Sequence, residues 1–134
     1  MTFRSLVIIA CATFALVPAA QAQPVSCDKA QTQLDLNICG AQAFEEADKR
    51  LNTAYKALMK DLDGEVKQLT RDGQRAWITF RDKECLAQAG GERTQASGSM
   101  WPMLHSMCLA DLTRQRAQQI EERMGDCVGG GKSC

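Results

Sequence analysis

Cysteine is the residue type in this sequence that offers the most chemistry. Beyond residue 22, the chain of 134 residues carries Cys27, Cys39, Cys85, Cys108, Cys127 and Cys134. No two of them have Cys-x-x-Cys spacing, so the pattern does not favour a zinc site, a thiol redox centre or covalent haem attachment. We therefore predict no metal ion and no cofactor, and the chemistry that remains is disulfide formation.

Residues that could support catalysis are few. His105 is the only histidine, and a lone histidine beside apolar helix positions is more often a packed or exposed side chain than a catalyst. The sequence contains no Gly-x-Ser-x-Gly, His-Glu-x-x-His or phosphate loop. Glu45, Glu46 and Asp48 offer carboxylates for acid–base chemistry on a glycan, but acidic helix faces usually serve solvation. We predict that the protein is not an enzyme.

The first 22 residues have the pattern of a secretory signal peptide. Arg4 precedes an apolar run over residues 6–17, and residues 18–22 end in an Ala-x-Ala cleavage signal. The run is shorter than the roughly 20 residues that a membrane-spanning helix needs, and Cys11 lies too early in it for a lipid-attachment site. We expect no transmembrane segment and a periplasmic or secreted protein, cleaved near Ala22.

Export changes how the cysteines and charges are interpreted. An even number of cysteines in a small exported chain implies disulfides, and six cysteines allow about 15 connectivities. Lys plus Arg and Asp plus Glu are balanced at 16 each, which gives no reason to expect nucleic acid or an anionic membrane as partner. We predict one domain over residues 23–125 and a Gly/Cys-rich tail over 126–134.

Apolar residues recur every three or four positions, which is typical of amphipathic helices. A first helix would bury Leu34, Ile38, Ala41, Phe44, Ala47, Leu51, Tyr55, Leu58 and Leu62. A second would bury Val66, Leu69, Ala76, Trp77, Phe80 and Ala87, and a third Trp101, Leu104, Cys108, Leu112 and Ile120. Asp63-Gly64, Gly90-Gly91 and Met124-Gly125 mark the predicted ends. The sequence predicts an all-α fold, a small disulfide-crosslinked antiparallel bundle of about three main helices.

Helix geometry limits the disulfide pairing. In an antiparallel hairpin about Gly64, Cys39 and Cys85 come level, and the next turn brings Cys108 to the same end. Cys27 and Cys39 would be about 18 Å apart along one straight helix, beyond the roughly 7 Å limit between bridged Cα atoms. That pair therefore requires a fold-back before Cys39. We favour Cys27–Cys39, Cys85–Cys108 and Cys127–Cys134.

Three stretches form a recognisable pattern: residues 32–39 with 47–55, residues 74–85 (QRAWITFRDKEC), and Cys108-Leu109 with Leu112-Thr113 and Arg116. In these stretches the chain resembles the LprI-type lysozyme-inhibitor domain, a family long catalogued as a domain of unknown function. The resemblance covers about residues 27–124. The chain departs from the family pattern at Gly90-Gly91-Glu92-Arg93, where a glycine-glycine-serine turn is usual, and in Cys127 and Cys134. The resemblance implies a small helical bundle, with lysozyme inhibition known for one branch and no assigned role for many members.

Two groups of polar residues lie at helical spacing. Trp77, Arg81 and Glu84 are spaced so that the guanidinium could stack on the indole and meet the carboxylate. They could contact a partner, or Trp77 could be core while Arg81 pairs with a buried acid such as Asp48 or Glu84. Asp48 and Asn52 lie beside the first apolar stripe, within reach of Arg75 and Arg116. We predict a polar network of Asp48, Asn52, Arg75, Arg81, Glu84 and Arg116, which would help to specify helix register.

Residues 90–99 form a polar, glycine-rich loop that suits an inhibitor. A lysozyme cleft holds two carboxylates, so a plug needs positive or hydrogen-bond-donating groups such as Arg93, Thr94 and Gln95. The predicted Cys85–Cys108 disulfide would tether both flanks of the loop. Our hypothesis is that Arg93 enters the cleft of lysozyme, and the alternative is a loop without a role. The rival functions are a non-catalytic envelope module that binds another exported protein or peptidoglycan, and a structural protein without a specific ligand.

Overall fold

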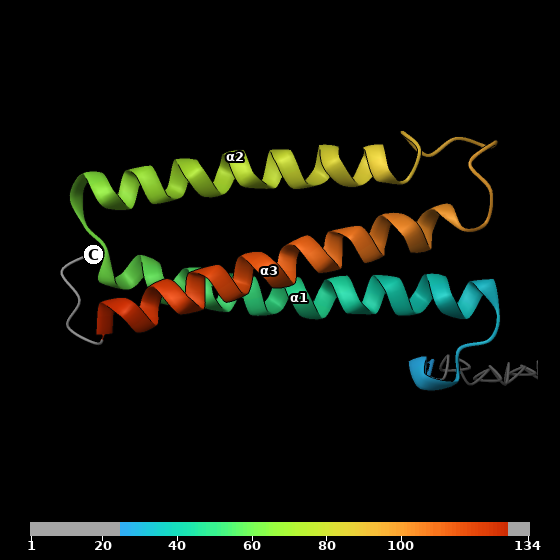
Figure 1. Cartoon of the computed structure of the whole chain (residues 1–134), viewed down its shortest axis with the longest axis horizontal. Coiled ribbons are helices and arrows are strands. Elements are labelled where there is room, and N and C mark those ends of the chain that lie inside the picture. Colours follow the sequence, from blue (N-terminus) through green and yellow to red (C-terminus); the bar gives the residue numbers. More distant parts are fainter. Residues whose placement is uncertain (1–24, 129–134) are drawn as a thin grey trace, which may run out of the picture.

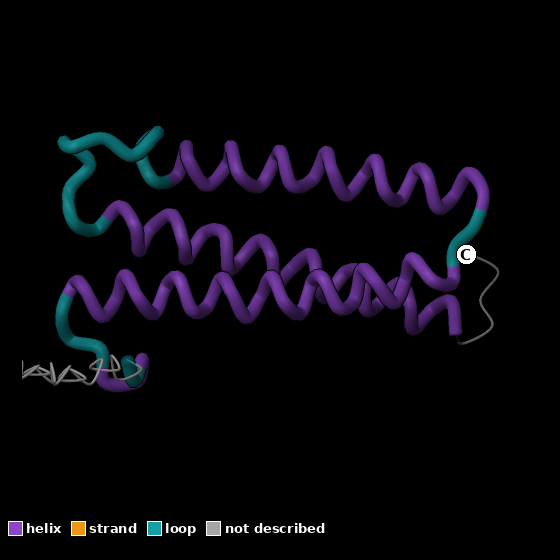
Figure 2. Tube along the Cα trace, turned by 180° about the vertical axis from the view of Figure 1, so that it is seen from behind, coloured by secondary structure: helices purple, strands orange, loops and turns teal. Residues whose placement is uncertain are grey.

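The computed structural model describes residues 25–128, and all regular structure in this range is helical. A 3-10 turn, η1 (Cys27–Lys29), is followed by three long helices, α1 (Gln33–Asp61), α2 (Gly64–Gln88) and α3 (Trp101–Val128) (Figure 1). No strand occurs among the described residues (Figure 2). The all-α prediction is confirmed, while the predicted signal peptide lies outside the described residues.

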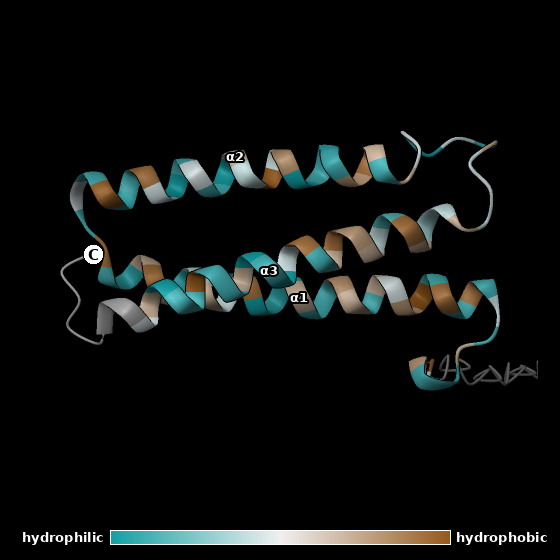
Figure 3. Cartoon of the chain, in the orientation of Figure 1, coloured by the Kyte–Doolittle hydropathy of each residue, from teal (hydrophilic) through white to brown (hydrophobic). Residues whose placement is uncertain are grey.

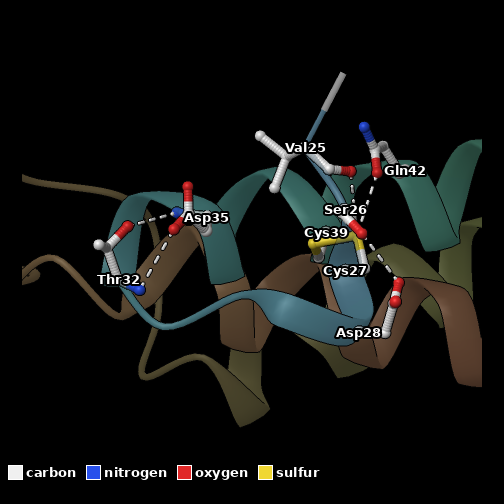
Figure 4. Close-up of a disulfide and its surroundings, with 8 residues drawn as sticks. All are labelled: Val25, Ser26, Cys27, Asp28, Thr32, Asp35, Cys39 and Gln42. Carbon is white, nitrogen blue, oxygen red and sulfur yellow. Dashed lines mark hydrogen bonds between the residues drawn. A yellow bond between two sulfur atoms is a disulfide. The ribbon is translucent and has the colours of Figure 1, made fainter. Parts of the chain in front are cut away.

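Local sequence signals set most helix ends. Thr32 and Asp35 form a capping box at the start of α1: the Asp35 amide donates to the Thr32 hydroxyl at 3.1 Å, and the Thr32 amide donates to the Asp35 carboxylate at 3.3 Å (Figure 4). These hydrogen bonds lower the pKa of Asp35. The chain turns between α1 and α2 at Gly64, whose φ is +50°, as predicted.

The third helix runs further than the sequence suggested. We expected it to end at Met124-Gly125, but α3 continues to Val128. Gly125 is not among the glycines with positive φ, so it has no left-handed cap. A glycine in a helix costs only about 1 kcal/mol relative to alanine, which α3 tolerates.

Consecutive helices are antiparallel, so α1 and α3 run parallel to each other (Figure 1). These two helices make the most extensive contact of the bundle. Small residues seven positions apart line their contact, Gly40, Ala47 and Ala54 on α1 and Ala110 and Ala117 on α3, and all five are buried. A Cβ atom at Gly40 would lie 3.3 Å from the Cβ of Ser106. Small side chains therefore let the two backbones approach closely.

The apolar core lies toward the end of the bundle where α1 meets α2. Its buried members are Leu51, Ala54, Leu58, Leu62, Ala117 and Ile120, with Tyr55, Met59, Trp77 and Met124 packed against them. A smaller cluster of Cys85, Cys108 and Leu109 lies nearer the other end, with Phe44 and Leu112 beside it. Nothing in residues 25–128 forms a helix that is both long and apolar enough to cross a membrane.

The predicted inner face of α2 is wrong except at Trp77, which is half-buried against the main core. Leu69 is 62% exposed and Phe80 55% exposed, and Val66, Ala76 and Ala87 are also exposed. The buried residues of α2 are instead Gln74, Arg81 and Cys85. Apolar periodicity identifies residues that share a face, but here the disulfide and the contacts of Arg81 turn a more polar face inward. Figure 3 shows these apolar residues as brown bands along α2, which lies apart from the other two helices.

Three further residues predicted to be buried are exposed. Leu34 and Leu104 are 67% and 43% exposed, and Ala41 is also open to solvent. All three lie near the cysteine-bearing end of the bundle, where the core is small. The apolar stripes of α1 and α3 therefore extend beyond the core that they help to form.

Two disulfides crosslink that end, and both were predicted. Cys27 and Cys39 have Cα atoms 5.6 Å apart because η1 folds back beside the second turn of α1 (Figure 4). Cys85 and Cys108 join the end of α2 to the start of α3, with Cα atoms 5.4 Å apart. The predicted Cys127–Cys134 pair lies outside the described residues, because Cys134 is not described.

Candidate functional site

The loop between α2 and α3, residues 89–100, lies at the disulfide-linked end of the bundle (Figure 1). It begins with a Schellman cap, in which the Gly91 amide donates to the Leu86 carbonyl at 2.7 Å and the Gly90 amide to the Ala87 carbonyl at 3.2 Å. Gly90 has φ of +87°, a conformation that favours glycine. The glycine pair therefore stops α2 and directs the chain into the loop.

The tip of the loop is held by its own hydrogen bonds. The Thr94 amide donates to the Ser97 hydroxyl at 2.7 Å, and the Ser97 amide donates to the Thr94 carbonyl at 3.2 Å. The Thr94 hydroxyl also accepts from the Ala96 amide at 3.2 Å. Thr94 thus shapes the turn, while Arg93, Thr94 and Gln95 are all exposed.

Both flanks of the loop are tied to the helices. The indole of Trp101 donates to the Gly91 carbonyl at 3.0 Å and stacks on His105 with ring centroids 4.7 Å apart. The Asn37 side chain on α1 donates to the Ser99 carbonyl at 3.0 Å. Together with the Cys85–Cys108 disulfide, these contacts attach both flanks of the loop to the helices. Sequence reasoning identified the disulfide but missed Trp101 and Asn37 as loop supports.

Arg93 is the cationic group of this loop. Its guanidinium carbon lies 5.9 Å from the centroid of the Trp101 ring, at the outer limit of a cation–π contact. Glu92 precedes it, so the loop carries one charge of each sign. The loop therefore offers a positioned hydrogen-bond donor beside a carboxylate, and it is not a broadly positive surface.

An apolar rim continues from the loop onto α3. Met100, Leu104 and Met107 follow one another at helical spacing and are 51%, 43% and 49% exposed. Methionine adapts its shape easily and is common on surfaces that bind other proteins. The sequence analysis missed this rim, although the spacing of the three residues was a visible signal. We call residues 93–95 together with Met100, Leu104 and Met107 the loop surface.

Trp77 and Arg81 are not part of the loop surface. Arg81 lies nine residues before Gly90 on α2, about 14 Å along the helix axis, and is 8% exposed. Trp77 is half-buried and packs against the main core. The position of both residues supports the structural reading over direct contact with a partner.

Arg81 lies at the centre of a polar network between the helices. Its guanidinium donates to the Asp82 carboxylate at 2.7 and 2.9 Å and to the Thr113 hydroxyl at 3.2 Å, and it lies 4.0 Å from the Asp48 carboxylate. Asn52 donates to Asp48 at 2.7 Å. Aromatic rings of α1 and α2 also face this guanidinium, Phe44 at 5.3 Å and Trp77 at 5.4 Å.

Three predicted members, Arg75, Glu84 and Arg116, do not bond to that network. Arg75 is exposed and lies 3.7 Å from the Asp72 carboxylate, and Glu84 accepts a hydrogen bond from Gln88. Arg75 lies on a different face of α2 from Arg81. Glu84 lies one turn from Arg81 on the helix surface, where such residues are neighbours, but its carboxylate accepts from Gln88 on the following turn. Asp82 and Thr113 take part instead, which the sequence did not indicate.

Arg116 forms a neighbouring group with α2. It donates to the buried Gln74 side chain at 3.0 Å, and its guanidinium lies 5.8 Å from the Trp77 ring. Partial burial, with a smaller contribution from nearby Arg123, lowers the pKa of Arg116. Polar contacts therefore hold α2 to α3 along the middle of both helices.

The arrangement gives no support for catalysis or metal binding within the described range. His105 stacks on Trp101, and residues 25–128 hold no group of three His, Cys, Asp or Glu side chains that could bind a metal ion. What the site offers is an exposed loop, tied to the helices at both flanks, with exposed apolar side chains beside it. Such a surface suits binding to another protein.

The fold and the loop together define a small disulfide-crosslinked helical bundle of the kind found among exported proteins. The family model for the lysozyme inhibitor LprI matches residues 26–120. The chain belongs to this family, whose named activity is inhibition and is not catalytic in kind.

Two relatives extend the comparison. An uncharacterized protein, R02472, of Rhizobium meliloti (strain 1021) is 38% identical over 134 residues, covering 90% of this chain and 92% of the relative. The uncharacterized protein YecT of Escherichia coli (strain K12) is 32% identical over 111 residues, covering 69% of this chain and 67% of YecT. No solved structure gives a significant match. These names specify no target, so the target has to be argued from the site.

Proposed function

We propose that this protein is exported, loses residues 1–22 as a signal peptide, and binds a lysozyme so that the enzyme's cleft is blocked. The support at family level is the match to the LprI lysozyme inhibitor model. The single observation that carries the proposal is the loop surface, a projection tied by Cys85–Cys108, by Trp101 and by Asn37. Because this loop is already ordered, binding would lose little conformational entropy.

The chemistry of a lysozyme cleft suits this projection. Two carboxylates flank the scissile bond, one protonated as the general acid and one ionised. A guanidinium can donate two hydrogen bonds to an ionised carboxylate in a fixed geometry. Arg93 is the exposed group of the loop that could do this, and Gln95 adds an uncharged donor.

The apolar rim would supply most of the buried area. Met100, Leu104 and Met107 are about half exposed, and burying apolar surface gives about 25 cal/mol for each Å². Arg93 would then determine the position of the loop in the cleft, while the rim contributes affinity. This division matches interfaces in which a few anchors and an apolar centre carry the binding energy.

The test is an activity titration of hen-type and goose-type lysozymes with the oxidised, leader-free protein. We expect saturable inhibition of at least one class, and an Arg93→Ala variant that inhibits at least about 10-fold more weakly, a loss of roughly 1.4 kcal/mol. Arg114→Ala is the control, because Arg114 is also an exposed arginine and lies on α3 about 20 Å along the helix from the loop; its contact is an exposed ion pair with Asp111 at 2.8 Å.

Three results would count against the proposal. No inhibition of either class at micromolar concentration would shift the function to binding of another exported protein. Equal inhibition by Arg93→Ala and the wild type would remove Arg93 from the cleft. Equal effects of Arg93→Ala and Arg114→Ala would show only a general dependence on charge.

A further inference from the structure

An apolar stripe runs along the side of α2 that faces solvent. Its members are Val66, Leu69, Gly73, Ala76, Phe80 and Ala87, separated by three, four or seven residues. All six are exposed, and the stripe extends over about 32 Å at 1.5 Å per residue. We call these residues the α2 stripe. Exposed apolar side chains along one face of a helix, here interrupted by Lys83 between Phe80 and Ala87, can mark an interaction site.

Gly73 gives independent evidence that something packs on this stripe. A Cβ atom added at Gly73 would meet nothing within 4 Å, and its φ is not positive. Within one molecule, therefore, neither space nor backbone conformation requires a glycine there. Glycine in the middle of a helix is also unfavourable relative to alanine. A close neighbour outside the molecule would explain the missing side chain.

We propose that the α2 stripe pairs with the α2 stripe of a second copy of this chain, antiparallel and about a two-fold axis. A two-fold interface must be complementary to itself when read in the opposite direction. With the axis at the level of Ile78, Phe80 of each copy lies opposite Ala76 of the other, and Leu69 lies opposite Ala87. Each large side chain meets a small one, as close packing requires.

Charge supports the same alignment. Lys83 continues the spacing of the stripe and lies opposite Gly73 of the second copy, where the absence of a side chain leaves room for it. Asp72 is adjacent to Gly73 and about half exposed; its carboxylate accepts from the Gln68 side chain at 2.9 Å, and its ion pair within the described residues is the 3.7 Å contact with Arg75. The ammonium group of each Lys83 would therefore reach the Asp72 carboxylate of the other copy, twice per dimer.

The position of α2 leaves this side free. Figures 1 and 2 show α2 as an outer helix, apart from the closely packed α1 and α3. The loop surface lies beyond the end of α2, so pairing along the stripe leaves it accessible. The dimer therefore goes beyond the proposed function and does not depend on it.

The test is sedimentation equilibrium of the oxidised, leader-free protein over a concentration series. We expect a reversible monomer–dimer equilibrium. Leu69→Glu should raise the dissociation constant at least about 100-fold, because every substitution acts twice in a two-fold dimer. Leu34→Glu is the matched control: Leu34 is also a leucine, is 67% exposed against 62% for Leu69, and lies on α1 away from the stripe.

Two more variants separate the interface from folding. Gly73→Leu should stabilise the isolated molecule, because leucine favours helix and a Cβ atom at this position meets nothing within 4 Å, yet it should weaken the dimer. Lys83→Asp should weaken the dimer, and the double variant Asp72→Lys with Lys83→Asp should restore it.

The pairing would be overturned by a protein that stays monomeric across the series, or by Leu69→Glu and Leu34→Glu with equal effects. Failure of the charge exchange to restore dimerisation would refute the antiparallel alignment. Recovery of a different protein bound to the stripe of a monomeric chain would assign the surface to another occupant. Lysozyme inhibition by the Leu69→Glu monomer would leave the proposed function intact.

Discussion

Replacing Arg81 with methionine tests whether a buried cation stabilises this bundle. Methionine keeps the unbranched apolar stem and removes the guanidinium. The substitution deletes the bonds to Asp82 at 2.7 and 2.9 Å, the bond to Thr113 at 3.2 Å and the approach to Asp48 at 4.0 Å. It also deletes the contacts with two aromatic rings.

The size of the effect depends on which partners of Arg81 can bond to water once the guanidinium is gone. The side chains of Asp82 and Asp48 are 51% and 45% exposed, so both carboxylates rehydrate and their ion pairs contribute less than about 1 kcal/mol. Thr113 is fully buried, and losing its donor costs about 1–3 kcal/mol. Two cation–π contacts add about 0.5–1 kcal/mol each to the loss. Because methionine is uncharged, the variant avoids the desolvation penalty of a buried guanidinium, and this offsets part of the loss. We expect Arg81→Met to lower the free energy of unfolding by about 2 kcal/mol.

Urea unfolding with both disulfides intact measures this loss, which corresponds to a midpoint about 1 M lower for a typical m-value. The decisive comparison adds Thr113→Val. The double variant replaces both polar partners with apolar groups and should recover at least about 1 kcal/mol relative to the sum of the single losses. Wild-type stability of Arg81→Met, or simple additivity of the two substitutions, would refute the proposed role of the network.

Three further predictions concern stability. Gly73→Ala, measured on dilute protein, should raise the free energy of unfolding by about 0.5–1 kcal/mol, because the added methyl group meets nothing within 4 Å. Gly40→Ala should not raise the free energy of unfolding, because its methyl group would lie 3.3 Å from a side chain of α3. Replacing Cys85 and Cys108 with serine should cost about 3 kcal/mol of unfolding free energy and weaken lysozyme inhibition. A hydrogen bond from Arg50 lowers the pKa of Glu121 from 4.5, so this carboxylate stabilises the fold above that pH and loses its effect as pH falls through the lower folded-state pKa. Stability of Glu121→Gln should therefore decline less steeply below about pH 4.5 than that of the wild type.

Each of these predictions has a result that contradicts it. Equal stabilisation by alanine at Gly40 and Gly73 would mean that α1 and α3 are not in close contact. Full inhibition by the serine variant would show that the loop needs no covalent support. An acid denaturation curve unchanged by Glu121→Gln would remove the ion pair with Arg50 from the pH dependence.

Local signals made the helices and crosslinks predictable. The glycines at 64 and 90–91 mark the junctions of α2, and the fold-back required for Cys27–Cys39 is supplied by η1. These features depend on a few neighbouring residues or on distance limits along a helix. The three-helix architecture follows from them, because short connections place consecutive helices antiparallel.

The orientation of α2 could not be predicted in the same way. Periodicity groups Leu69 with Phe80, but burial of the opposite face depends on Arg81 reaching Thr113 and on Cys85 reaching Cys108 across helices. Those contacts join residues that are 32 and 23 positions apart in the chain. A rule that places the most apolar face inward therefore fails where a polar network and a disulfide set the rotation of the helix.

The same reasoning explains why the disulfides lie where they do. The end of the bundle near Leu58 has the main apolar core, whereas Met100, Leu104 and Met107 at the other end are about half exposed. Burying the exposed half of such a side chain would stabilise the fold by about 1 kcal/mol, but it would remove the side chain from any binding surface. A disulfide contributes about 3 kcal/mol without using that surface. Cys85–Cys108 therefore stabilises the end that has little core and leaves the loop surface free to bind.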